Sequence, residues 1–187
     1  MNDAVPFCAS DTGVIIVDHG SKRAESNEML LRFVELFQSQ GGYAIVEPAH
    51  MELAEPSIAT AFDRCVRRGA RLVVVCPYFL LPGRHWYEDI PALTAQAARQ
   101  HPGISHMVTA PIGLHTLMAR VIQSRIDHCL RRVAGLESAC DVCENTESGC
   151  EMKPVNLTPG SSIPGSSAPG SSAPGSSGSM EISEHLA

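Results

Sequence analysis

Strand-like and helix-like segments alternate along this sequence, and that alternation constrains its fold more than any other feature. Short apolar runs rich in β-branched residues are each followed by a segment whose apolar residues recur at the helical period of 3.6. We predict strands at 13–17, 43–51, 72–76 and 106–110. Elements that alternate in this way over short links favour a parallel sheet. The predicted fold class is therefore α/β, a parallel sheet with helices on both faces in a single-domain subunit.

The helical segments carry continuous apolar stripes. We expect the second helix to open at Pro56, because a proline at the first helical position loses no hydrogen bond, and to end at Gly69. The last helix has the most regular stripe, and its apolar residues are Leu114, Leu117, Met118, Val121, Ile122, Ile126, Cys129, Leu130 and Val133. Cys65 and Cys129 fall on apolar faces, so we expect both to behave as small core residues.

Composition and charge exclude some classes of function. The 187 residues carry a formal net charge of −6 and no basic stripe, so we expect no nucleic-acid partner. No apolar run approaches the roughly 18 residues that span a bilayer, and residues 1–12 lack the pattern of a secretory signal. We therefore expect no membrane partner. The 7 cysteines are an odd number and are partly clustered, which argues against a disulfide framework.

The composition changes after Gly135, and this change divides the chain. We expect an N-terminal segment at 1–12, the α/β domain at 13–135, a Cys-rich appendage at 136–153 and a tail at 154–187. The tail consists largely of repeated Pro-Gly-Ser-Ser, which has little apolar surface to bury, so the sequence predicts a disordered segment. The repeat fits a natural tail, and its regularity also suits an engineered linker.

Three ionisable side chains follow three successive predicted strands. His19 comes after the first strand, Glu52 after the second, and His85 in the loop between the third strand and a helix expected at about 89–100. Ligands of open parallel sheets bind beyond the carboxyl ends of the strands, so we expect these side chains at one site. Imidazole binds transition metals and accepts protons, and a carboxylate takes up a further proton or orients a histidine.

Each of these residues also has a plain structural explanation. A single histidine in a loop is usually only solvated, and Glu52 could simply place negative charge near the next helix N-terminus. Asp18 could be only a hydrogen-bonding residue of the turn after the first strand. His50 alternates with Glu52 and could share its face of the strand, which makes it a weaker candidate. The joint arrangement of His19, Glu52 and His85 is what favours a functional site.

The motifs around these residues closely resemble those of the small sirohydrochlorin chelatases, the short CbiX/SirB-type class II enzymes. The matching strings are Val17-Asp-His-Gly-Ser21, Glu52-Leu-Ala-Glu-Pro-Ser57 and Pro82-Gly-Arg-His85 with Asp89-Ile-Pro91. The match covers roughly residues 13–135. The resemblance implies a chelatase-like fold, a homodimer of single-domain subunits, and a lyase-type ferrochelatase that inserts Fe²⁺ into sirohydrochlorin to give sirohaem.

The resemblance also implies roles for individual residues. His19 and His85 take the place of the two metal-binding histidines, and Glu52 that of the acidic residue in the active site. Sirohydrochlorin is a polycarboxylate, so Arg84 is a candidate for binding it, and Ser21 in the turn after His19 is another. The cationic Lys22 and Arg23 lie close in sequence, but a plain surface role suits them, like Arg84, about equally well.

A cysteine cluster follows the last predicted helix. Cys140, Cys143 and Cys150 form a C-x₂-C-x₆-C pattern, which can bind zinc or an iron–sulfur cluster, or can be three unligated thiols. Plant-type sirohydrochlorin ferrochelatases resemble this chain in having a Cys-rich C-terminal extension, and that resemblance implies a [2Fe–2S] cluster and a location in the chloroplast stroma.

Two alternatives remain open from the sequence. The first is a cobalt chelatase of the corrin pathway, because histidine and carboxylate ligands do not decide between Fe²⁺ and Co²⁺. The second is an iron–sulfur or other metal-binding module without chelatase activity, in which His19, Glu52 and His85 are incidental.

Overall fold

The computed structural model describes residues 8–144. The chain divides into two compact units, residues 1–125 and 126–187, and the boundary falls inside helix α4 (Thr116–Val133). Cys150 and the predicted tail at 154–187 lie outside the described residues, so the expectations for them remain predictions.

The first unit is built on a four-stranded parallel sheet. Its strands are β1 (Thr12–Asp18), β2 (Ile45–His50), β3 (Leu72–Pro77) and β4 (Ser105–Val108), in the order β2-β1-β3-β4. β1 pairs with both β2 and β3, which explains why it is apolar almost throughout. All four predicted strands are present, and the parallel α/β fold class is confirmed.

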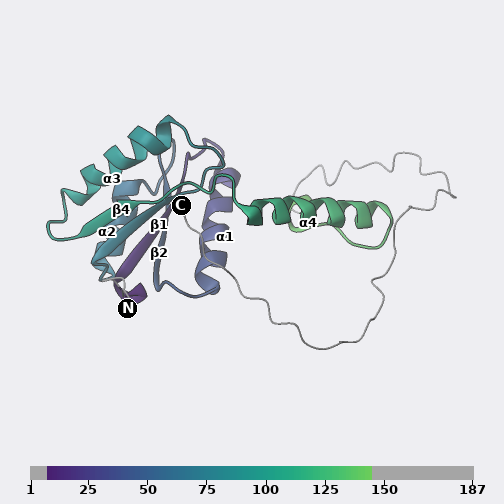
Figure 1. Ribbon diagram of the computed structural model, residues 1–187, viewed down its shortest axis with the longest axis horizontal. Coiled ribbons are helices and arrows are strands. Elements are labelled where there is room, and N and C mark those ends of the chain that lie inside the picture. Colours follow the sequence, from purple (N-terminus) through teal and green to yellow (C-terminus); the bar gives the residue numbers. More distant parts are fainter. Residues whose placement is uncertain (1–7, 145–187) are drawn as a thin grey trace, which may run out of the picture. The chain divides into compact units, whose positions relative to one another are not determined.

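Helices cover both faces of this sheet (Figure 1). They are α1 (Ala24–Ser39), α2 (Ile58–Arg67) and α3 (Ile90–Ala98). Successive β1 side chains point to opposite faces: Ile15 packs in the core under α2 and α3, whereas Val14 packs in a second core with residues of α1. The core under α2 also contains Cys65, which is fully buried as expected.

Two helix starts differ from the sequence-based expectation. Ser57 is the N-cap of α2, and its Oγ accepts a hydrogen bond from the Thr60 N–H at 3.3 Å, so Pro56 lies before the helix. A serine hydroxyl can satisfy a free N–H at the helix end, and proline cannot. In addition, His85 is not in a loop: it opens η2 (His85–Asp89), a π-helical turn that leads directly into α3.

Helix α4 is present where the periodicity predicts it, but its apolar stripe is not buried. Side chains that are each more than half exposed in the chain include Leu117, Val121, Ile122, Ile126 and Leu130. Cys129 is only partly buried, so the expectation of a core residue was wrong; the apolar residues that share its stripe are exposed as well. The short elements η1 (Ala9–Asp11) and α5 (Asp141–Glu144) complete the described chain.

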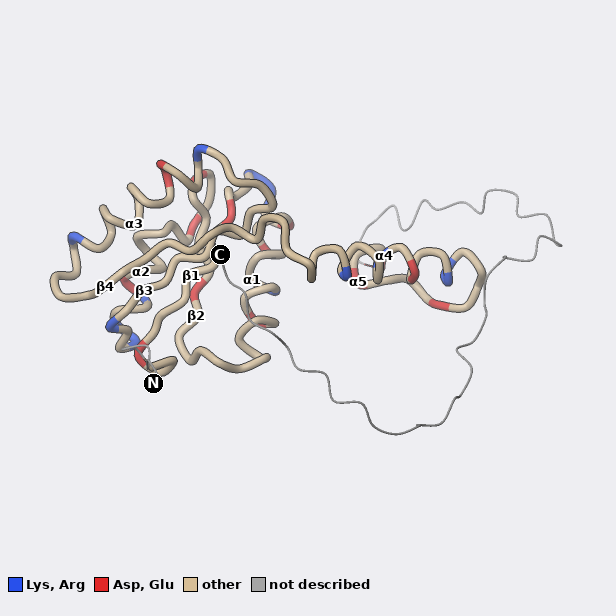
Figure 2. Tube along the Cα trace, viewed as in Figure 1, with Lys and Arg blue, Asp and Glu red and all other residues tan. Residues whose placement is uncertain are grey.

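Positively and negatively charged residues are mixed along the described chain. Figure 2 shows Lys and Arg interspersed with Asp and Glu along the tube. None of the helices among residues 8–144 is long and apolar enough to cross a bilayer.

Candidate active site

The carboxyl ends of β1 and β2 are joined by backbone hydrogen bonds that continue past the strands. The Met51 N–H donates to the Asp18 carbonyl at 2.8 Å, and the Glu52 N–H donates to the His19 carbonyl at 3.2 Å. These bonds place the side chains of His19 and Glu52 opposite each other. His19 Nε2 lies 2.7 Å from Glu52 Oε1, and both side chains remain about half exposed, at 43% and 53%.

His85 reaches the same place from the far side of β1. Its ring centroid lies 5.3 Å from that of His19, with the two ring planes 67° apart. The structure therefore brings together the three residues that the sequence singled out at three strand ends. Phe79 flanks His85 on another side, with ring centroids 6.3 Å apart.

Asp89 fixes the orientation of His85. Its Oδ2 lies 2.8 Å from His85 Nδ1, and this hydrogen bond, with a smaller contribution from the Arg84 charge, holds the pKa of the Asp89 carboxyl below its ordinary value. An ionised carboxylate at Nδ1 leaves Nε2 as the ring nitrogen that is available to a ligand. No role for Asp89 was predicted from the sequence. Its position four residues after His85 would have indicated this contact if a helical turn had been expected there.

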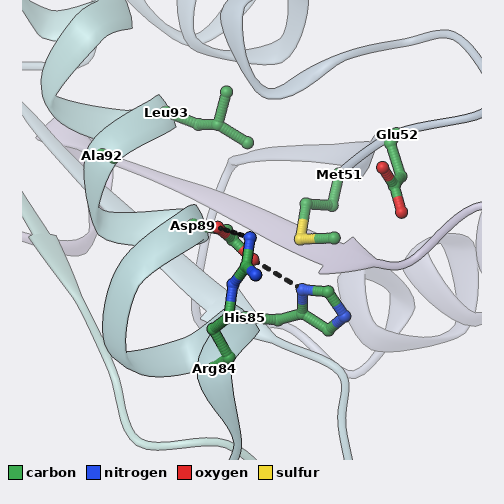
Figure 3. A pocket seen from close by; sticks show the side chains of 7 residues that line it. All are labelled: Met51, Glu52, Arg84, His85, Asp89, Ala92 and Leu93. Atoms are coloured by element: carbon green, nitrogen blue, oxygen red, sulfur yellow. Dashed lines mark hydrogen bonds and ion pairs between the residues drawn. The ribbon is translucent and has the colours of Figure 1, made fainter.

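A cleft of about 610 Å³ opens beside these residues (Figure 3), within the size range of small-molecule sites. Its walls differ in character. One part is apolar and the other is charged, and the lining residues are Met51, Glu52, Arg84, His85, Asp89, Ala92 and Leu93. Arg84 lines the cleft, with Nη2 3.5 Å from Asp89 Oδ1, and its part in substrate binding remains a prediction. His19 touches the cleft residues Glu52 and His85 without lining the cleft itself.

Ser21 is held in the turn between β1 and α1. Its N–H donates to Asn27 Oδ1 at 2.8 Å, its carbonyl accepts from Asn27 Nδ2 at 2.8 Å, and its Oγ accepts from the Arg23 N–H at 3.1 Å. These bonds give Ser21 a structural role, and it is not among the cleft residues. Its predicted part in substrate binding remains a prediction.

The site is not arranged as a finished metal centre. Among residues 8–144, no three His, Cys, Asp or Glu side chains are grouped to hold a metal ion. Glu52 also occupies Nε2 of His19, so a metal would have to compete for that nitrogen. The arrangement offers two imidazoles and two carboxylates that can exchange protons and bind a divalent ion at the edge of a cleft.

Comparison with known proteins identifies the family. The model of the CbiX family matches residues 13–129. The chain belongs to the CbiX family. It is 59% identical over 134 residues to the chloroplastic sirohydrochlorin ferrochelatase of Arabidopsis thaliana, a match that covers 72% of this chain and 60% of that protein. The chain thus spans less than two thirds of the length of this relative.

Solved structures of the family share the fold. The CbiX protein of Marinobacter aquaeolei superposes with a TM-score of 0.57 at 30% identity, covering 65% of this chain and 98% of that one. The sirohydrochlorin chelatase SirB of Bacillus subtilis subspecies spizizenii, solved in complex with cobalt, has a TM-score of 0.59 at 30% identity and covers 63% of this chain and 50% of that one. The chelatase-like architecture expected from the motifs is confirmed.

Proposed function

We propose that this protein is a sirohydrochlorin ferrochelatase, which exchanges two pyrrole protons of sirohydrochlorin for Fe²⁺ and yields sirohaem. The observation that carries the proposal is the meeting of His19, Glu52 and His85 beside a charged and apolar cleft. The 59% identity to a relative named as a sirohydrochlorin ferrochelatase supports the same assignment. That relative is chloroplastic, which supports a plastid location for this protein.

The geometry suggests a separate role for each of these residues. His85 has a free Nε2 and presents Fe²⁺ to the ring. His19 becomes a second ligand when its bond to Glu52 opens, and the released carboxylate is then free to take a proton. Only two protein ligands would hold the metal, and both bonds are labile, so the metal can pass from them to the macrocycle. Arg84, at the cleft edge, is suited to pairing with a substrate carboxylate.

Spectroscopic titration tests this function directly. Purified protein is mixed with sirohydrochlorin, with and without Fe²⁺, and the absorption spectrum is followed. We expect binding without metal and a protein-dependent change to the sirohaem spectrum with Fe²⁺. A protein that carried metal but neither bound nor altered sirohydrochlorin would instead be a metal-binding module.

Cobalt insertion is the second candidate, because similar proteins are named for it and the SirB structure holds cobalt. The same two histidines suit both ions. Measuring kcat/KM for Fe²⁺ and Co²⁺ side by side, in the absence of oxygen, decides between them.

We further propose that the protein is a homodimer in which α4 packs against a second copy. The exposed apolar residues of α4 support this interface, since surface of that kind gains about 25 cal/mol per Å² on leaving water.

The cysteines are proposed to hold a [2Fe–2S] cluster through Cys140, Cys143 and Cys150. Cys140 and Cys143 are three residues apart and partly buried. Hydrogen bonds, first from the Cys143 backbone and then from its side chain and from the Val142 backbone, hold the pKa of Cys140 below its ordinary value. They favour the thiolate that iron requires. Bound there, the cluster would supply one-electron chemistry. Zinc without acid-labile sulfide in purified protein would contradict this choice.

A further inference from the structure

A second histidine–carboxylate pair lies at the last residues of β1 and β2. His50 Nδ1 is 2.6 Å from Asp18 Oδ1, and the two residues are neighbours in the register of β1 and β2. Only 1% of the His50 side chain is exposed, against 25% for Asp18. His50 is therefore one of the few buried polar residues of the described chain, and it is not part of the cleft lining.

This pair is tied to both members of the exposed pair. Asp18 Oδ1 also accepts a hydrogen bond from the Gly20 N–H at 2.9 Å, so the residues on either side of His19 are fixed by one carboxylate. His50 lies two residues before Glu52 in the same strand end.

The turn that carries His19 is also packed tightly against the end of β2. Gly20 has a φ of +84°, and a Cβ atom at that position would lie 2.1 Å from the Glu52 carbonyl oxygen and 3.1 Å from the His50 Cβ. A side chain cannot be accommodated there. Small movements of His50 or Asp18 must therefore be passed to the turn and to Glu52.

We propose that His50 and Asp18 are positioning residues of the metal-insertion site. They hold the turn after β1 so that His19 faces Glu52 and His85 at once. Neither residue lines the cleft, so the pair acts by setting the orientation of His19. This inference rests on the proposed chelatase function, and it assigns to that function two residues that the exposed site alone does not reveal.

The test compares two substitutions of the same buried residue. His50→Leu keeps much of the side-chain volume and removes the ring N–H that donates to Asp18. His50→Asn places an amide N–H close to the position of Nδ1. We expect His50→Leu to lower kcat for chelation by about 10- to 100-fold, with KM for sirohydrochlorin changed by less than about 3-fold. His50→Asn should recover most of that loss. The affinity for Co²⁺ alone, followed by its visible absorption, should fall and recover in parallel.

A double-mutant cycle tests the route of the effect. If His50 acts through the His19–Glu52 pair, His50→Leu should lower kcat by less than about 3-fold when Glu52→Gln is already present. Should His50→Leu fail to fold, Asp18→Ala, which changes a partly exposed residue, should show the same loss of kcat.

The outcomes separate the two proposals. A wild-type protein that does not insert Fe²⁺ into sirohydrochlorin would contradict the proposed function. If the wild type is active, any of three results overturns the positioning role. They are an unchanged kcat in His50→Leu or Asp18→Ala, equal losses of kcat in His50→Leu and His50→Asn, and full additivity of His50→Leu with Glu52→Gln.

Discussion

The two histidines of the site differ in which ring nitrogen a carboxylate holds. Asp89 binds Nδ1 of His85 and leaves Nε2 free, whereas Glu52 binds Nε2 of His19, whose Nδ1 lies 3.3 Å from the Gly20 carbonyl. In the proposed mechanism, His85 can bind a metal ion through Nε2 directly, whereas His19 must first break its contact with Glu52. The different carboxylate partners are the basis on which we propose different roles for the two imidazoles.

Replacing either histidine should abolish most of the chelation. We expect His19→Ala and His85→Ala each to lower kcat/KM by about 100-fold or more, because each removes one of two proposed metal ligands. Folding should be retained, since the side chains are more than 40% exposed. His106→Ala, which changes an exposed histidine of β4, is the control. Rates near wild type in a folded variant would remove that histidine from the mechanism.

Asp89 should matter through its charge. Its pKa is lowered, so the carboxylate stays ionised through the ordinary Asp range. Its hydrogen bond to His85 is lost only as the pH falls through the lowered pKa. Asp89→Asn should lower kcat by about 10- to 100-fold at neutral pH and remove that acid-side loss from the pH–rate profile.

The neighbouring carboxylate provides a matched control for Asp89. Glu88 is 72% exposed and lies 3.7 Å from the Arg84 guanidinium, so Glu88→Gln should leave the rate within about twofold. An equal loss in both variants would argue against a specific role for Asp89.

At the scale of elements, the sequence predicted what periodicity encodes. The four strands, the helices after them and the strand-end positions of His19, Glu52 and His85 follow from apolar patterns and the rules of parallel sheets. The π-helical turn η2 was not predicted, because a single turn leaves no repeat in the sequence. The pairing of Asp18 with His50 was not predicted either, since it depends on the register between β1 and β2, which no local spacing reveals.

Helix α4 provides a prediction at the same scale. Ile122 lies at the middle of its exposed apolar stripe, so Ile122→Glu should raise the dimer dissociation constant by at least about 10-fold. Gln123→Lys, one position along the helix, should leave it unchanged. Light scattering coupled to gel filtration over a range of concentrations measures both. A wild type that is monomeric at every concentration would contradict the proposed dimer.

At the scale of the whole molecule, Cys65 reports on the integrity of the core. Burial raises the pKa of its thiol to about 12, so almost no thiolate exists at neutral pH while the fold is intact. The residue packs against the backbone of β1 at Gly13 and so is exposed only when sheet and α2 separate.

Thiol labelling with mass spectrometry measures this. Cys65 should react at least about 100-fold more slowly than the exposed Cys8 in native protein, and at a similar rate in denaturant. Rapid labelling of Cys65 in native protein would mean that the core opens locally.

The π-helical turn at η2 makes the geometry of the candidate site sensitive to chain length and not only to side-chain identity. Each residue of a regular helix advances about 100° around the axis, and a π-turn holds one residue more than an α-turn. Removing one residue between His85 and Ile90 would restore a regular helix and swing His85 by that angle, away from His19. In this protein, a single deletion in this segment should therefore separate the two imidazoles, whereas substitutions that keep its length should leave them together.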